Sequence, residues 1–67
     1  MLTQLGLLLQ QARERAGLTQ AELSELSQVS ARTIRDLEKG RGNIGIRPLG
    51  QLANVLGLKL SLTPAHE

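Results

Sequence analysis

The residues with the clearest chemical potential are basic, and most of them lie in the second half of the chain. Residues 30–59 hold six basic side chains against two acidic ones, whereas residues 1–29 hold two basic and three acidic ones. The six are Arg32, Arg35, Lys39, Arg41, Arg47 and Lys59. A guanidinium group can donate paired hydrogen bonds to a phosphate or to a guanine edge. This cluster favours a polyanionic partner, although a charge run is also typical of an ordinary solvated surface.

Other chemistries lack the residues they need. The chain has no cysteine, and its one histidine, His66, lies in a polar tail, so neither a metal site nor a catalytic pair is indicated. It also has no aromatic residue, which removes the stacking platforms that hold single-stranded nucleic acid and RNA. Duplex DNA is read by hydrogen bonds and phosphate contacts and needs no such rings. We therefore expect no catalytic residue, no metal and no cofactor, and a protein that is not an enzyme.

The elements that must position these side chains are two short helices within residues 19–40. Thr19 and Glu22 have the spacing of a capping box, which predicts a helix start. Ser30 can cap a second helix with apolar positions Ile34 and Leu37, and Gly40 stands where a left-handed residue ends a helix. Only Gln28 and Val29 separate the two patterns. Helices joined so closely must cross steeply, which predicts a helix-turn-helix.

The remaining chain supports this unit within one domain, residues 1–67. A first helix is expected to about Ala16, with an apolar stripe formed by Leu5, Leu8, Leu9, Ala12 and Ala16. Leu7 falls off that stripe and is either an ordinary exposed leucine or part of a partner surface. Pro48 suits the first turn of a fourth helix that Gly57 ends. The leucine-rich start is too short for a membrane span and lacks a signal peptide's basic flank, which predicts a cytoplasmic protein.

The alternation in residues 58–62, LKLSL, predicts a half-buried strand. No second strand pattern is present, and the amides of a strand need a ladder partner. The simplest partner is the same strand in a second copy, which would place Leu58, Leu60 and Leu62 against the helices and form a homodimer. The alternative is a frayed tail after the fourth helix.

These residues also carry a family resemblance. The segment from Gly17 to Gly40 resembles the Xre, or Cro/cI-like, helix-turn-helix repressors through Gly-Leu-Thr-Gln at 17–20, Glu22-Leu23, Val29-Ser30, Thr33-Ile34 and Leu37-Glu38. The tail at 53–62 is similar to the HipB-like antitoxin branch. The resemblance implies an all-α, lambda-repressor-like domain of four to five helices, with one C-terminal strand that pairs across a homodimer.

The resemblance also implies roles for individual residues. Gln20 would hold a phosphate beside the start of its helix, a position where free amides favour an anion. The outer positions of the next helix, about 30–39, would face the major groove. Base contacts are expected from Arg32, then Arg35, with Ala31 and Asp36 beside them. Phosphate contacts are expected from Ser30, Thr33, Lys39, Arg41 and Arg47.

Three structural details complete this interpretation. The resemblance pairs Arg13 with Glu38 as a partly buried ion pair that joins the first and third helices. Gln28 stands where the family usually has glycine, so it either adopts left-handed geometry at a cost of about 1 kcal/mol or lies in a different turn. Ser27 replaces a small apolar residue, and its hydroxyl can bond back to a carbonyl.

The function expected is a dimeric transcriptional repressor that binds an inverted repeat in double-stranded DNA. The HipB-like branch further implies an antitoxin that binds a HipA-like kinase toxin. A stand-alone phage, plasmid or restriction-modification regulator is the alternative. A protein-interaction module without DNA binding is the alternative from a different class.

Overall fold

The computed structural model describes residues 2–61, with Leu2 and Thr3 described by their backbone alone. This part of the chain forms four helices and no strand. The helices are α1 (Leu2–Arg15), α2 (Gln20–Ser27), α3 (Ala31–Glu38) and α4 (Ile46–Leu56). Within residues 2–61, none of the four combines the length and the apolar character that a membrane crossing requires.

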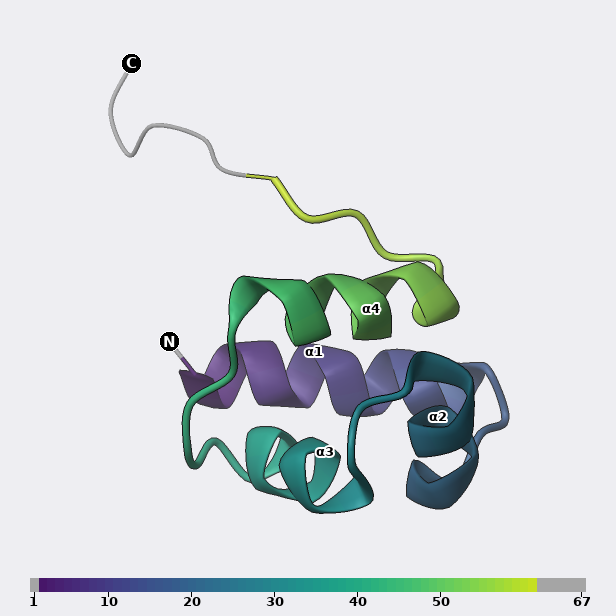
Figure 1. The fold of residues 1–67 in the computed structure, drawn as a ribbon, viewed down its shortest axis with the longest axis horizontal. Helices are drawn as coiled ribbons and strands as arrows, with labels where there is room; N and C mark the ends of the chain where they lie inside the picture. Colours follow the sequence, from purple (N-terminus) through teal and green to yellow (C-terminus); the bar gives the residue numbers. More distant parts are fainter. Residues whose placement is uncertain (1, 62–67) are drawn as a thin grey trace.

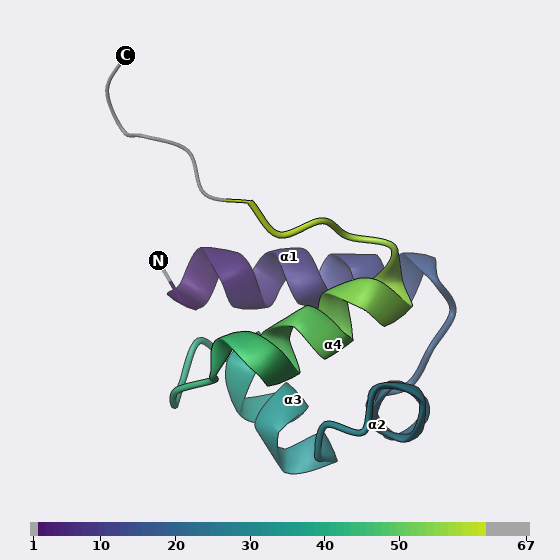
Figure 2. The same cartoon turned by 45° about the horizontal axis from the view of Figure 1, so that its top comes forward.

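The helices pack around one shared core rather than in layers. The most extensive contacts join α1 to α3 and α2 to α4, and α2 also packs against α3 (Figure 1). Figure 2 shows α2 end-on, crossing the direction of α3 steeply. The core is apolar, and its most buried side chains are Leu23, Ile34 and Leu52, one from each of α2, α3 and α4.

The two short helices begin and end where the capping residues predict. At α2, the Oγ1 of Thr19 accepts from the amide of Glu22 at 3.0 Å, and the Glu22 carboxylate accepts from the amide of Thr19 at 2.8 Å. At α3, the Ser30 hydroxyl accepts from the amide of Thr33 at 3.1 Å. Beyond the end of α3, Gly40 has a φ of 73°. The predicted caps of the helix-turn-helix are confirmed.

The turn between α2 and α3 resolves the two alternatives for Gln28. Its φ of 67° and ψ of 18° place it in the left-handed region, and no other non-glycine among the described residues has a positive φ. Ser27 is 3 % exposed, and its Oγ accepts from the backbone N–H of Val29 at 3.2 Å. This hydroxyl therefore serves the turn instead of bonding back to a helical carbonyl.

The apolar stripe expected on α1 is only partly correct. Leu9 and Ala12 are buried, but Leu8 is 48 % exposed and Ala16 is exposed. The stripe is narrower because α1 meets α3 through Gly6, which is buried although it has no side chain. A Cβ built on Gly6 would overlap the carbonyl oxygen of Leu37. The buried face of α1 therefore includes Gly6 beside Leu9 and Ala12, and Leu8 lies outside it.

The fourth helix and the tail differ from expectation in different ways. Helix α4 begins at Ile46, two residues before Pro48, which lies in its first turn as predicted. The strand expected over residues 58–62 is absent from the described part of the tail, residues 58–61, which runs as an extended trace back over the helices (Figure 1). Leu62 lies outside the described residues. A single chain supplies no ladder partner, so the segment has no sheet to join.

The tail nevertheless packs on its own chain. The amide of Leu58 donates to the carbonyl of Ala53 at 2.8 Å, and the Leu58 side chain packs against the core. Leu60 is 43 % exposed, with its Cδ1 close to Gly50 of α4. Leu58 therefore packs on its own helices, whereas Leu60 remains largely exposed beside α4.

Candidate nucleic-acid interface

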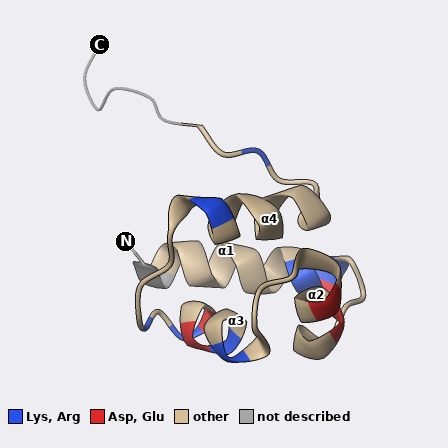
Figure 3. Ribbon diagram, viewed as in Figure 1, with Lys and Arg blue, Asp and Glu red and all other residues tan. Residues whose placement is uncertain are grey.

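Helix α3 separates an apolar face from a charged one. Ile34 and Leu37 are 2 % and 3 % exposed and face the core, while Arg32 and Arg35 lie exposed on the other side. Lys39, just beyond the helix, is also exposed. Figure 3 marks the basic and acidic residues along the ribbon of α3. The structure thus brings together three predicted cationic contacts on one accessible surface.

These cations have no ion-pair partner in the described part of the chain. Among the described residues, the single ion pair joins Arg13 to Glu38 and involves none of the cations on α3. A guanidinium without a partner keeps its donors available for a base edge or a phosphate. Arg32 and Arg35 therefore have free donors where a recognition helix would need them.

The other predicted residues at the start and on the side of α3 have different surroundings. Ser30 donates its hydroxyl hydrogen to the Oγ1 of Thr33 at 2.9 Å while it caps the helix. Ala31 is half-buried. Asp36 is also half-buried and lines a hollow of about 50 Å³ between α3 and the following loop. Asp36 therefore lies at the edge of the charged surface, beside the loop.

The two predicted phosphate contacts that follow Lys39 lie on different elements. Arg41 is exposed and lines the same hollow as Thr33 and Asp36, next to the end of α3. Arg47 is exposed in the first turn of α4, and α3 packs against α1 and α2 rather than against α4. Arg41 extends the surface of α3, whereas Arg47 stands apart from it.

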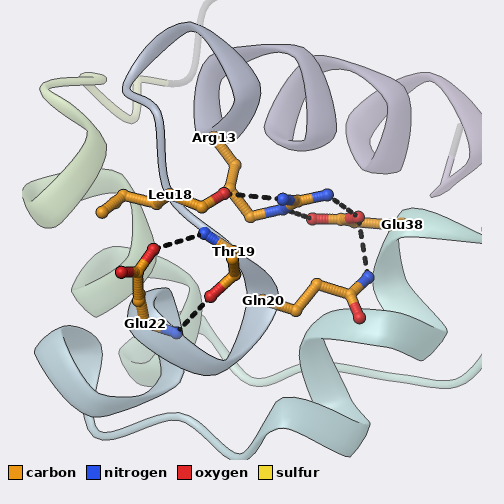
Figure 4. Close-up of polar contacts among 6 residues, drawn as sticks. All are labelled: Arg13, Leu18, Thr19, Gln20, Glu22 and Glu38. Carbon is orange, nitrogen blue, oxygen red and sulfur yellow. Dashed lines mark hydrogen bonds and ion pairs between the residues drawn. The ribbon is translucent and has the colours of Figure 1, made fainter.

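A cluster of three polar side chains joins α1, α2 and α3 (Figure 4). They are Arg13, Gln20 and Glu38. Arg13 donates from Nε to Glu38 Oε2 at 2.6 Å and from its Nη2 to Glu38 Oε1 at 3.0 Å. The Nη1 of Arg13 donates to the carbonyl of Leu18 at 2.8 Å. The ion pair that the resemblance implied is thus present with two parallel hydrogen bonds, and its side chains are 11 % and 5 % exposed.

The electrostatics of this pair favour a charged guanidinium. The hydrogen bonding of Arg13 to the Glu38 carboxylate raises the pKa of Arg13 above its ordinary value, against a smaller opposite effect of burial, and the charges of Glu38 and Glu14 act in the same direction as the hydrogen bonding. Arg13 therefore stays protonated across the physiological range.

The position of the Gln20 side chain was not foreseen. Its Nε2 donates to Glu38 Oε1 at 3.0 Å, so the amide lies against the ion pair instead of projecting freely from the start of α2 (Figure 4). Nothing in the sequence signals this contact, because the two residues are far apart in the chain and meet only when α2 and α3 cross. An amide has two N–H groups, and the contact uses one of them.

The described residues offer no site for metal chemistry. Within residues 4–61, no three His, Cys, Asp or Glu side chains come together as metal ligands would. The arrangement can bind and orient an anion, and it holds no nucleophile with a neighbouring base.

Comparison with known proteins identifies the family to which this helix arrangement belongs. The model of a helix-turn-helix family matches residues 9–62, which include α2, the turn, α3 and α4 in full. A search of curated proteins found no match. The matched family consists of DNA-binding regulators that are typically not enzymes. The chain therefore belongs to the Xre-like helix-turn-helix family.

Proposed function

We propose that this protein is a transcriptional repressor that binds double-stranded DNA in a sequence-specific manner, with α3 as the recognition helix. The observation that carries the proposal is the exposed and unpaired pair Arg32 and Arg35 on the face of α3 opposite its buried side. A helix fits the major groove, and a guanidinium bonds guanine O6 and N7 together. Arg32, near the start of α3, is assigned to base readout first and Arg35 second, with Ala31 and Asp36 beside them.

The surrounding polar residues are assigned to the phosphates. Lys39 and Arg41 are exposed at the end of α3, Thr33 and Gln20 supply uncharged donors around it, and Ser30 would reach a phosphate by turning its hydroxyl away from Thr33. Arg47 would reach a phosphate farther along the duplex, from the start of α4. Such contacts set the register of the protein on the DNA without reading sequence.

The repressor is proposed to act as a homodimer on an inverted repeat. The extended tail supports this proposal, because Leu58 packs against the core, Leu60 lies beside Gly50 of α4 although it is 43 % exposed, and Lys59 and Ser61 are exposed. A second tail could add to it as an antiparallel strand over residues 58–62. The two recognition helices would then enter half-sites about one helical turn, ~34 Å, apart.

An antitoxin role is proposed within this function. It is supported by the similarity of residues 53–62 to the HipB-like branch, whose members bind a HipA-like kinase toxin. The neighbouring gene tests it: a kinase-like product that co-purifies with this chain supports the role. An isolated gene would instead leave a stand-alone regulator.

The DNA-binding proposal is tested by selection from randomised duplexes, followed by mobility shift with the selected duplex. We expect one enriched inverted repeat and an affinity that falls ~10³-fold or more between 50 and 200 mM salt, as for a dimer with six or more phosphate contacts. Arg15→Ala is the matched control for substitutions of the α3 arginines, since Arg15 is an exposed arginine at the end of α1. Failure to enrich any sequence would contradict the proposal and favour a protein-interaction module.

A further inference from the structure

We propose that Glu38 is a positioning residue for DNA binding, which holds the amide of Gln20 ready for a phosphate. The inference rests on the proposed DNA-binding function and adds to it a residue that does not itself touch DNA. Glu38 stands at the end of α3 and Gln20 at the start of α2, so their contact links the two ends of the helix-turn-helix.

The first step is that the Glu38 carboxylate is itself fixed. Both of its oxygens accept from Arg13, at 2.6 and 3.0 Å, and its side chain is only 5 % exposed. Arg13 is anchored in turn by its bond to the carbonyl of Leu18, directly before the cap of α2. The carboxylate therefore has one position, and its Oε1 offers a fixed acceptor to α2.

The second step concerns the amide that meets this acceptor. Gln20 Nε2 donates one hydrogen to Oε1 at 3.0 Å, and the side chain is only partly covered. The second hydrogen of Nε2 has no acceptor among the described residues, so it remains available to a ligand. A glutamine side chain loses considerable rotamer freedom when it is fixed, and here that loss occurs during folding instead of during DNA binding.

The charge of Glu38 does not oppose a nearby phosphate, because the carboxylate is paired with the Arg13 guanidinium. The cluster thus presents the uncharged N–H donor of Gln20, held by a carboxylate whose charge Arg13 balances. It also fixes the distance between the Gln20 anchor and the reading positions of α3, since both are tied to the same carboxylate.

The inference predicts a specific pattern in ethylation interference, which maps contacted phosphates individually. On the selected duplex, Gln20→Ala should lose interference at one phosphate per half-site and bind about tenfold more weakly. Glu38→Ala should lose the same phosphate while the others persist, and the double variant should lose no further phosphate. A Glu38→Ala variant that keeps the Gln20-dependent phosphate would overturn the inference and leave DNA binding intact.

A second measurement covers the case in which Glu38→Ala does not fold. In the unbound wild-type chain, NMR relaxation should show the Gln20 side-chain amide as ordered as the backbone, whereas the exposed Gln51 amide on α4 should be mobile. Equal mobility of the two amides would overturn the inference. A wild-type chain that selects no DNA would instead contradict the proposed function itself.

Discussion

Gly6 of α1 lies directly against the carbonyl group of Leu37 in α3, so closely that the position has no room for a side chain. Leu37 is followed immediately by Glu38, whose carboxylate accepts from Arg13 of α1, the helix that also carries Gly6. The contact of Gly6 therefore allows α1 to approach near enough for the ion pair to form. Helix α1 therefore fixes α3 in two ways: through the close contact at Gly6 and through the ion pair of Arg13 with Glu38.

Replacing Gly6 with alanine should destabilise the fold, because the added methyl group would overlap backbone and would force α1 away from α3. We expect a loss of about 1–3 kcal/mol in the free energy of unfolding, measured by urea denaturation. Gly50→Ala is the matched control: it is also a glycine inside a helix, but the new methyl group would meet only Leu60 Cδ1 at 4.0 Å. The control should gain about 0.5–1 kcal/mol, and equal effects of the two substitutions would contradict the account.

Replacing Glu38 with alanine should destabilise the fold, because the largely buried guanidinium of Arg13 would lose its charged partner. The expected loss is about 3 kcal/mol, seen as a lower melting temperature by circular dichroism. Glu25→Ala removes an exposed carboxylate from α2 and should change stability by less than about 0.5 kcal/mol. Because the folded pKa of Arg13 is raised, its charge contributes to stability at all pH values below its ordinary pKa and is lost only above it. An unchanged melting temperature in Glu38→Ala would remove the pair from the stability of the fold.

Replacing Gln28 with glycine should stabilise the turn. The left-handed φ of 67° strains a side chain, and glycine adopts it freely, so we expect a gain of about 1 kcal/mol in chemical denaturation. Gln51→Gly, at an exposed position inside α4, should lose about 1 kcal/mol. Opposite signs for the same substitution would identify backbone conformation as the cause, whereas a loss at both positions would argue against strain at Gln28.

Arg32→Ala and Arg41→Ala should separate reading from anchoring. Loss of a base contact should cost about 1–3 kcal/mol on the selected duplex and reduce discrimination at one base pair. Loss of a phosphate contact should weaken binding to all sequences alike and lower the salt slope by about one. Mobility shifts on the selected and on scrambled duplexes at several salt concentrations distinguish the two. Identical behaviour of both variants would contradict the assignment.

Lys59→Pro and Ser61→Pro should weaken dimerisation without disturbing the monomer fold. The Leu58 amide already bonds Ala53 of α4, and amides at alternate positions of an extended segment point to opposite sides. The amides of residues 59 and 61 are thus the ones available to a second tail, and proline removes them. Sedimentation should show a shift toward monomer. Deletion of residues 58–67 with an unchanged dimer would show that the contact lies elsewhere.

How much of this could be predicted from the sequence depended on the range of the interactions. The caps at Thr19 and Ser30 and the end at Gly40 follow from neighbouring residues, so the helix-turn-helix was predictable. The Gly6 contact was missed because apolar periodicity marks side chains, and this helix crossing depends on the absence of one. Gly6 does share a helical face with Leu9 and Arg13, which is the signal that could have revealed it.

The tail and the polar cluster show two further features that the sequence alone could not predict in full. Alternation at residues 58–61 assigned Leu58 to the packed side, where it lies, but Leu60 is 43 % exposed, and a strand also needs a ladder, which one chain does not contain. The bond from Gln20 to Glu38 depends on the crossing of α2 and α3, and that crossing is fixed by a turn conformation at Gln28 that local sequence left open. Contacts between distant residues required the structure.

The two faces of α3 have a practical consequence for changing what this protein recognises. Ile34 and Leu37 secure the helix in the core, while Arg32 and Arg35 make no ion pair with the rest of the described chain. Substitutions at the two arginines should therefore leave folding almost untouched, since exposed positions without partners seldom affect stability by more than about 0.5 kcal/mol. A library randomised at these positions would retain nearly all of its members as folded protein, which makes this 67-residue chain a compact starting point for new sequence preferences.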